Sequence, residues 1–210
     1  MIELERRLRR ALKPPLPGLD AQLRMAPAPR IGWDPLHPPS DLRDAAALVL
    51  VYPLNDLPHV LLTVRGAALR KHTGQISLPG GSVDEDESIE SAALREASEE
   101  VGVLPSSVHV IGRLTPLQIP ISGYLLHPVV GVAEPRPIFR REEWEVARIL
   151  EVPLTVLRDP SIVRRRTQPR QFRGQTIEME IPYFDVGGEQ VWGATAMVLA
   201  EFLAVLESAP

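Results

Sequence analysis

One acidic segment restricts the possible folds of this chain more than any other part of the sequence. Residues 81–102 read GSVDEDESIESAALREASEEVG and hold eight carboxylates among 22 residues, with Arg95 as the single basic residue. A face made mostly of small residues lets a helix lie close against a sheet. Residues 88–101 predict such a helix, because small or apolar residues recur four apart on one face: Ile89, Ala93, Ala97 and Val101.

The opposite face of this predicted helix concentrates negative charge. Glu96 and Glu100 lie about one turn apart and Glu99 lies three residues from Glu96, so the three carboxylates share one patch. Like charges at these spacings destabilise a helix by roughly a few tenths of a kcal/mol per pair. The spacing leaves two interpretations open: a solvated acidic surface, or a site for a hard divalent cation such as Mg²⁺, which prefers oxygen ligands.

Apolar runs before and after the acidic segment predict strands. Residues 45–54 (AAALVLVYPL) and 59–65 (HVLLTVR) are separated by the turn sequence NDLP, so we expect them to pair. Residues 109–117 and 124–134 predict two further strands. Pro128 cannot donate a backbone hydrogen bond, which places the second of these strands at a sheet edge or at a bulge.

The C-terminal third of the chain mixes strand and helix signals. Residues 142–159 combine a short strand or helix with the start of a further helix, and their assignment stays open. Residues 171–193 predict a hairpin, and residues 194–208 predict a helix. The core face of that helix carries Val198, Leu199, Phe202, Leu203 and Leu206. Strands and helices in this order indicate an α+β fold with a mixed sheet.

The N-terminal part differs in composition from the rest. Residues 1–12 carry leucines four apart between arginines, which predicts a short amphipathic helix. We expect it to pack on the protein's own body or on a second subunit, so a homodimer is one predicted assembly; membrane binding is the alternative. Residues 14–39 are rich in proline and predict an extended arm. We therefore divide the chain into this helix and arm, 1–40, and a compact domain, 41–210.

Composition and charge narrow the functional classes. The chain has no cysteine, which excludes disulfides, thiolate metal sites and a cysteine nucleophile. The charged start, MIELERRLRR, lacks the apolar core of a signal peptide, and no apolar run approaches the roughly twenty residues that span a bilayer. We therefore expect a cytoplasmic protein with no membrane partner. A net charge of −4 argues against nucleic acid as the main partner, because binding to phosphate backbones normally needs a basic face.

The loop before the acidic helix narrows the interpretation. Pro79, Gly80 and Gly81 form a turn whose backbone can approach a ligand closely. Together with the helix, the segment resembles the Nudix box, which runs Gly, five residues, Glu, seven residues, Arg-Glu, an aliphatic residue, any residue, Glu-Glu, any residue, Gly and an aliphatic residue. The matching positions are Gly81, Glu87, Arg95, Glu96, Ala97, Glu99, Glu100, Gly102 and Val103. The resemblance implies the Nudix fold, a mixed β-sheet sandwiched between helices in an α/β/α arrangement.

The same resemblance implies an activity and roles for individual residues. Nudix enzymes hydrolyse a nucleoside diphosphate linked to another group, using Mg²⁺ or Mn²⁺. By this resemblance Glu96 and Glu100 are metal ligands, and Glu99 shares the metal or orients water. The resemblance also implies that Arg95 belongs to the catalytic site. There we expect it to fix the loop by an ion pair with Glu87.

A second signature lies directly upstream of the box. Residues 61–81, LLTVRGAALRKHTGQISLPGG, resemble the extended signature of the coenzyme A pyrophosphatase branch of the Nudix family. Gly66 stands where that signature has serine, and Leu78 where it has phenylalanine. The matches are Leu61, Leu62, Thr63, Arg65, Arg70, His72, Gly74, Gln75, Ser77, Pro79, Gly80 and Gly81. This resemblance implies cleavage of coenzyme A, or of its thioesters, into 3',5'-ADP and 4'-phosphopantetheine.

Several upstream residues are candidate substrate contacts. Arg65 and Arg70 suit a substrate with several phosphates, because a guanidinium offers paired donors to phosphate oxygens; the alternative for each is a surface arginine. Gln75 serves either the loop or a polar substrate contact, and His72 bonds its own loop or the substrate. Gly80 and Gly81 are also candidate substrate contacts, because their backbone can approach a ligand closely.

Two further questions stay open from the sequence. Glu145 is a candidate extra metal ligand or base, and Glu142 and Glu143 compete with it for that role. The alternative functions are a Nudix hydrolase of another nucleotide, such as ADP-ribose, NADH or a dinucleoside polyphosphate, and a Nudix-fold binding module without catalysis. The complete box favours an enzyme.

Overall fold

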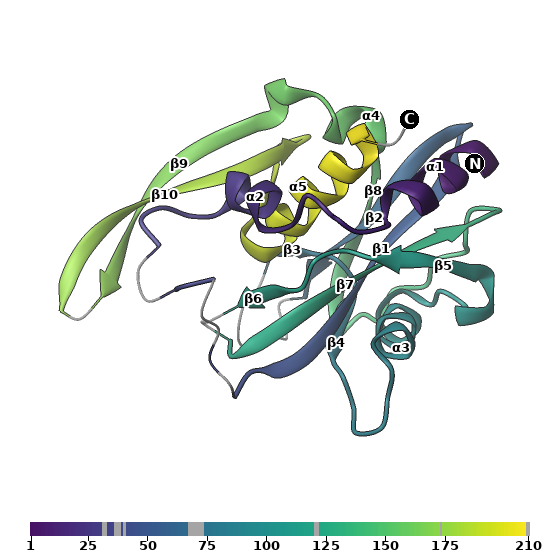
Figure 1. Cartoon of the computed structure of the whole chain (residues 1–210), viewed down its shortest axis with the longest axis horizontal. Coiled ribbons are helices and arrows are strands. Elements are labelled where there is room, and N and C mark those ends of the chain that lie inside the picture. The colour runs from purple at the N-terminus through teal and green to yellow at the C-terminus, as the bar shows by residue number, and fades with distance from the viewer. Residues whose placement is uncertain are drawn as a thin grey trace.

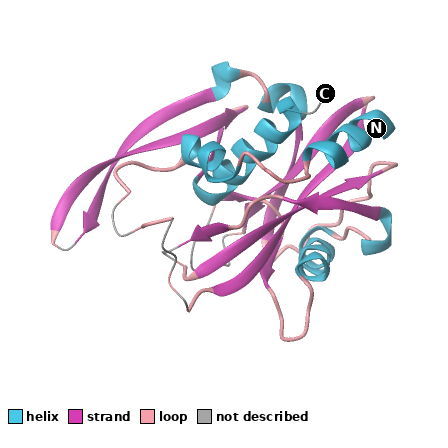
Figure 2. Ribbon diagram, in the orientation of Figure 1, coloured by secondary structure: helices cyan, strands magenta, loops and turns pink. Residues whose placement is uncertain are grey.

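The computed structural model describes residues 1–30, 33–35, 39, 41–66, 74–119, 122–172 and 174–208. Within these residues, eight strands form one mixed sheet and three strands form a second, smaller sheet. Helices cover both faces of the larger sheet, as Figure 1 shows along the chain and Figure 2 by secondary structure. The helices are α1 (Ile2–Ala11), α2 (Gly18–Gln22), α3 (Ile89–Val101), α4 (Leu154–Leu157) and α5 (Gly193–Ser208), with short 3-10 helices at Leu23–Met25, Pro105–Ser107 and Pro160–Ile162. The strands are β1 (Arg43–Leu54), β2 (Leu57–Arg65), β3 (Ile76–Ser77), β4 (Gly80–Ser82), β5 (Val108–Arg113), β6 (Leu117–Ile119), β7 (Tyr124–Ala133), β8 (Val146–Pro153), β9 (Val163–Phe172), β10 (Gln175–Val186) and β11 (Glu189–Trp192).

Strand β1 lies at the centre of the larger sheet. The order is β3-β2-β1-β7-β5, and β4, β6 and β8 pair with β1, β7 and β2 respectively. Strands β1 and β2 are antiparallel, with Val51 opposite Val60, and they are joined by a turn in which Asn55 and Asp56 have positive φ angles of 50° and 63°. The predicted pairing of residues 45–54 with 59–65 is therefore confirmed.

The two faces of β1 pack against different helices. Val49 and Val51 belong to a core cluster with α5 and α1, whereas Leu48 and Leu50 belong to a second cluster with α3. This alternation follows from the two-residue period of a strand, and residues 45–54 of β1 form a continuous apolar run because both faces are covered there. The predicted arrangement of a mixed sheet between helices is confirmed.

The N-terminal and C-terminal helices lie together on one face of the sheet (Figure 1). Leu8 of α1 is fully buried and Leu12 is 8% exposed, so α1 packs on the protein's own body, which is one of the two surfaces predicted for it. All five residues predicted for the core face of α5 are buried. None of the helices in the described ranges is long and apolar enough to cross a membrane.

The predicted extended arm, residues 14–39, contains more structure than its proline content indicates. Helix α2 and the 3-10 helix after it pack against α5, and Ala21, Gln22 and Met25 are buried. The prediction of a fully extended arm is wrong for this part, because residues 18–25 contain no proline and therefore keep every backbone N–H group.

Two strand predictions also need correction. Residues 109–117 form β5 and β6 with a break between them, instead of one strand. Pro128 lies in β7, which has neighbours on both sides, so the edge position is wrong. The predicted alternative was a bulge, and the pairing of β5 with β7 has a register shift close to Pro128, opposite Val130 and Gly131. Pro128 lies at the point where the strand beside β7 changes, because β6 pairs with β7 up to Leu126 and β5 pairs with it from Val129. The missing N–H of Pro128 is tolerated at this junction, and its carbonyl accepts the Leu114 N–H at 2.9 Å.

The smaller sheet has one strand more than predicted. Residues 171–193 were expected to form a hairpin, and β10 and β11 do so. Strand β9 precedes them and pairs with β10 along its length, so the hairpin is the part of a three-stranded sheet that the sequence shows most clearly. The β9–β10 ribbon extends away from the larger sheet (Figure 2).

Candidate active site

Helix α3 is built so that its last turn lies on the sheet. Ser88 caps the N-terminus, since its Oγ accepts a hydrogen bond from the Ser91 N–H at 3.1 Å. Gly102 ends the helix in the left-handed conformation, with φ of 71°. Ala93 and Ala97 are fully buried against the sheet. The helix predicted over residues 88–101 is confirmed, and its small side chains bring the carboxylates of the last turns close to β4.

Two glycines of β4 allow close packing, one against strand β1 and the other against helix α3. A Cβ atom on Gly80 would lie 2.4 Å from the carbonyl oxygen of Ala46 in β1, so a side chain here would push β4 off the sheet. A Cβ atom on Gly81 would lie 2.5 Å from the carboxylate carbon of Glu96. Gly81 therefore leaves the space in which the Glu96 carboxylate rests, whereas Gly80 lets β4 lie close to β1. Contact of the two glycines with substrate stays a prediction.

Arg95 holds the acidic loop to the helix. Its guanidinium donates to both carboxylate oxygens of Glu87, each at 3.0 Å, and to the Ser82 carbonyl at 2.9 Å. It also donates to Glu96 at 2.8 Å and to Glu99 at 3.3 Å. Hydrogen bonds from Arg95 lower the pKa of Glu87, which keeps that carboxylate ionised and paired. The ion pair expected between Arg95 and Glu87 is present, and the same guanidinium also contacts two of the predicted metal ligands.

Glu100 is the buried carboxylate of the site. The residue is 4% exposed, and its Oε2 is buried without a hydrogen-bond partner. Burial raises the pKa of Glu100 to about 8; the charge of Arg65 and a backbone hydrogen bond from Gly80 lower this pKa, and the charges of Glu96 and Glu145 raise it. Because buried polar atoms nearly always have partners, an unpartnered carboxylate oxygen in this position fits a bound cation.

The structure distinguishes among the three glutamates that precede β8. The charge of Glu145 raises the pKa of both Glu96 and Glu100, although burial is the larger cause for each. Glu142 instead donates its backbone N–H to the Glu100 carbonyl at 2.8 Å, and Glu143 pairs with a neighbouring arginine at 3.2 Å. Of the three candidates left open by the sequence, Glu145 is the one whose charge reaches the carboxylates of α3.

The donor set suits a hard divalent cation. Carboxylate oxygens are ligands that Mg²⁺ and Mn²⁺ prefer, and Mg²⁺ sites are usually completed by water and substrate phosphate. In the part of the chain that the structure describes, no three Asp, Glu, His or Cys side chains gather closely enough to hold a metal ion by themselves. Glu96, Glu100 and Glu145 can therefore supply part of a coordination sphere, and the rest must come from water, substrate or side-chain movement.

The predicted substrate contacts are described only in part. Arg65 ends β2, where its N–H donates to the Gln75 carbonyl at 2.9 Å and its carbonyl accepts the Gly74 N–H at 3.1 Å. The Nε atom of Arg65 is buried without a hydrogen-bond partner. Arg70 and His72 lie outside the described residues. The structure thus places Arg65 and the backbone of Gln75 at the site, and contact of either with substrate stays a prediction.

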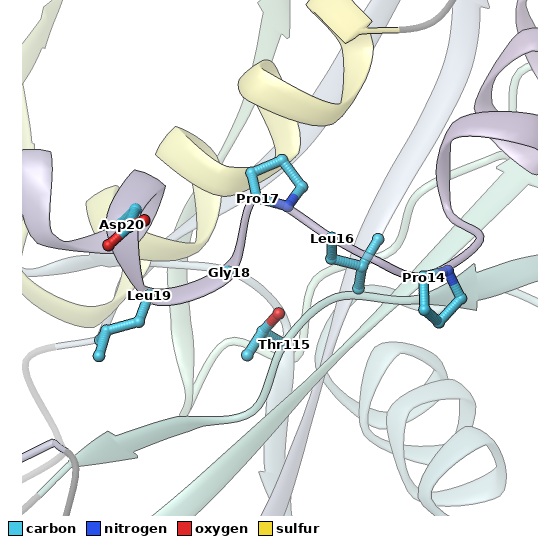
Figure 3. Close-up of a pocket in the computed structure, with 7 residues that line it drawn as sticks. All are labelled: Pro14, Leu16, Pro17, Gly18, Leu19, Asp20 and Thr115. Atoms are coloured by element: carbon cyan, nitrogen blue, oxygen red, sulfur yellow. The ribbon is translucent and has the colours of Figure 1, made fainter.

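A separate pocket lies between the N-terminal arm and the loop that joins β5 to β6 (Figure 3). Its volume is about 520 Å³, and it does not include the carboxylates of α3. Beside it, the fully buried Glu201 of α5 accepts hydrogen bonds from the Gly18 N–H, the Thr115 N–H and the Gln22 side chain at 2.8–3.2 Å. The pocket is lined by Pro14, Leu16, Pro17, Gly18, Leu19, Asp20 and Thr115.

Sequence reasoning missed two features near the carboxylates. These are the close fit of Gly66 against the turn before β8, which the signature alone does not show, and the position of Trp144 in that turn. A tryptophan among charged residues, directly beside a candidate ligand, is the signal that points to that segment.

Comparison with known proteins agrees with this geometry. The family model described as "NUDIX domain" matches residues 42–165. The chain is 39% identical over 178 residues to a protein of Shigella flexneri serotype 5b named "Uncharacterized Nudix hydrolase NudL", over 82% of this chain and 85% of that protein. A protein of the same name from Pectobacterium atrosepticum is 36% identical over 176 residues, over 83% and 88% of the two chains. The crystal structure of a Nudix hydrolase from M. Smegmatis, RenU, is similar in fold, with a TM-score of 0.53 and 19% identity over 80% of this chain and 88% of that chain.

Proposed function

The chain belongs to the Nudix hydrolase family, and from this premise we propose that it hydrolyses the diphosphate of coenzyme A, or of its thioesters, to 3',5'-ADP and 4'-phosphopantetheine. The observation that carries the proposal is the Glu100 carboxylate, which is buried, has one unpartnered oxygen and lies near the charge of Arg65. This arrangement suits a substrate that brings both phosphate oxygens and a metal ion to the same place.

The preference for coenzyme A is supported by the segment upstream of the helix. Residues 61–81 resemble the extended signature of the coenzyme A branch, and Arg65 within it lies at the end of β2 beside the carboxylates. Coenzyme A carries a third phosphate in addition to its diphosphate. Arginines suit such a substrate, because a guanidinium can donate two parallel hydrogen bonds to phosphate oxygens.

Each carboxylate has a distinct place in this proposal. Glu96 and Glu100 hold Mg²⁺ or Mn²⁺ together with Glu145, whose charge reaches both. A cation bound at this position would neutralise the charge on the diphosphate oxygens and lower the pKa of a bound water. The Glu99 side chain is 60% exposed and orients water from the outer side, while Arg95 keeps the loop and Glu96 in position.

The test is product analysis by mass spectrometry. Coenzyme A, ADP-ribose and NADH are offered separately with Mg²⁺ or Mn²⁺, and the wild type is compared with Glu100→Gln. We expect metal-dependent formation of 3',5'-ADP from coenzyme A. The variant should lose at least about a hundredfold in rate, as other electrostatic catalytic groups do on removal.

A matched control comes from the same helix. Glu90 lies in the first turn of α3 and pairs with Arg113, so Glu90→Gln should keep turnover within about twofold of wild type. Cleavage of another nucleotide alone would remove coenzyme A and keep the hydrolase. No cleavage of any of the three would favour a binding module, and unchanged turnover in Glu100→Gln would exclude Glu100 as a ligand.

A further inference from the structure

Trp144 is a large aromatic side chain that stays open to solvent beside the carboxylate site. It is 74% exposed, and the charge of the next residue, Glu145, contributes to the raised pKa values of Glu96 and Glu100. Isolated apolar side chains are common on protein surfaces, so exposure alone has no functional meaning. The position beside the candidate ligands is what distinguishes this tryptophan from other exposed residues.

The turn that carries Trp144 is fastened on two sides. The Glu142 N–H donates to the Glu100 carbonyl of α3 at 2.8 Å, and the Gly66 N–H at the end of β2 donates to the Glu145 carbonyl at 2.7 Å. Trp144 lies between these two anchors. The backbone of Trp144 is therefore fixed between the helix and the strand that frame the site, and its side chain is left exposed.

Gly66 allows this turn to approach β2. A Cβ atom at position 66 would lie 2.8 Å from the Trp144 carbonyl oxygen, closer than real side chains come to a backbone oxygen. Any other residue would push the turn outward. Gly66 is also one of the two positions at which the chain departs from the coenzyme A signature.

We propose that the indole of Trp144 stacks on the nucleobase of the substrate at the outer edge of the carboxylate site. Aromatic side chains stack on any base, because every base has a π-face, and a rigid indole loses little entropy on binding. Arg65, which precedes Gly66, is then placed to contact the phosphates of the same molecule. The inference rests on the proposed function only in requiring a nucleotide substrate, which coenzyme A, ADP-ribose and NADH all satisfy.

The kinetic test separates binding from chemistry. Trp144→Ala should raise KM about tenfold, the typical loss on removing one base-stacking aromatic, and change kcat less than about twofold. Trp144→Phe should keep KM within about threefold of wild type, because it keeps an aromatic face. Ile138→Ala is the matched control, since Ile138 is 79% exposed in the same segment. An unchanged KM in Trp144→Ala would overturn the proposal.

A binding test does not depend on turnover. Trp33 and Trp192 are half-buried, so acrylamide quenching of the tryptophan fluorescence reports mainly on Trp144. AMP and ribose 5-phosphate differ only in the base. We expect AMP to protect Trp144 from quenching and ribose 5-phosphate not to, with no effect of AMP in Trp144→Phe. Equal protection by both compounds, or protection by 4'-phosphopantetheine and not by AMP, would contradict base stacking while leaving the hydrolase assignment intact.

The role of Gly66 is tested through coupling. Gly66→Ala should raise KM as Trp144→Ala does, because the added Cβ displaces the turn. In the Trp144→Ala background the same glycine substitution should cause little further rise in KM. Additive effects of the two substitutions on KM would show that Gly66 acts independently of the indole.

Discussion

Replacing Glu100 by glutamine should stabilise the metal-free protein, and increasingly so as the pH rises. Burial raises the pKa of Glu100 to about 8 in the fold, compared with 4.5 for an unperturbed glutamate. Between these values the unfolded chain has released the proton while the folded chain retains it. The stability of the wild type therefore falls as the pH rises through this window. Glutamine has nearly the same shape and no charge, so the variant lacks this loss.

The expected magnitude follows from the two pKa values of Glu100. A tenfold change in an ionisation constant is worth about 1.4 kcal/mol, so the destabilisation by this carboxylate is about 1 kcal/mol at pH 5 and about 4 kcal/mol at pH 8. The free energy of unfolding of Glu100→Gln, relative to wild type, should therefore grow by about 3 kcal/mol between these pH values. Mg²⁺ should stabilise the wild type at pH 8 and leave the variant nearly unchanged, because ligands stabilise the state that binds them.

The assay is urea denaturation at pH 5 and pH 8 in the presence of a chelator. Glu90→Gln is the control: the hydrogen bonds from Arg113 lower the pKa of Glu90, so this carboxylate stays ionised throughout the window and its replacement should have no pH-dependent effect. A pH-independent difference between Glu100→Gln and wild type would refute the reasoning. The Glu100 carboxylate would then not be destabilised by burial, and the case for a cation at its Oε2 would lose its physical basis.

Two further substitutions test the scaffold around the site. Gly81→Ala should displace the Glu96 carboxylate, which a Cβ atom would approach to 2.5 Å, and lower kcat at least about tenfold with little change in KM, as measured by steady-state kinetics. Glu201→Gln should lower the free energy of unfolding by about 2–3 kcal/mol, as measured by urea denaturation. The reason is that the amide NH₂ of glutamine would face backbone N–H groups that donate to the carboxylate in the wild type. An unchanged denaturation midpoint would mean that Glu201 does not hold the arm.

Much of the fold was predictable because its signals are local. The four-residue spacing in α3, the two apolar runs of β1 and β2, and the core face of α5 each lie within one short segment. Such patterns record which face of an element is buried, and they need no knowledge of its partner. The Nudix box belongs to the same class, since all its positions lie between Gly81 and Val103.

The features that the sequence did not predict depend on distant contacts. A glutamate in α5 is normally expected on the surface, but Glu201 is fully buried because its hydrogen-bond donors come from Gly18, Gln22 and Thr115. The short helix α2 forms in the same contact with α5. The proline content of the arm is a local signal and therefore does not predict this helix. The sequence also leaves open which of the three glutamates in residues 142–145 is the candidate ligand. The approach of this turn to β2 and α3 is what distinguishes Glu145 from the other two.

The charges of the site divide into an outer and an inner group, although the box places its glutamates side by side in sequence. On the outer side, Glu99 is mostly exposed and already bonded to Arg95, so it has little further need of positive charge. On the inner side, Glu100 is buried with an open oxygen, and Arg65 is the cation whose charge acts on it most strongly. Glu96 touches both groups, since it is bonded to Arg95 and lies near enough to Glu100 to raise its pKa. The unmet demand for a cation is therefore on the inner side, where helix, sheet and the turn before β8 meet.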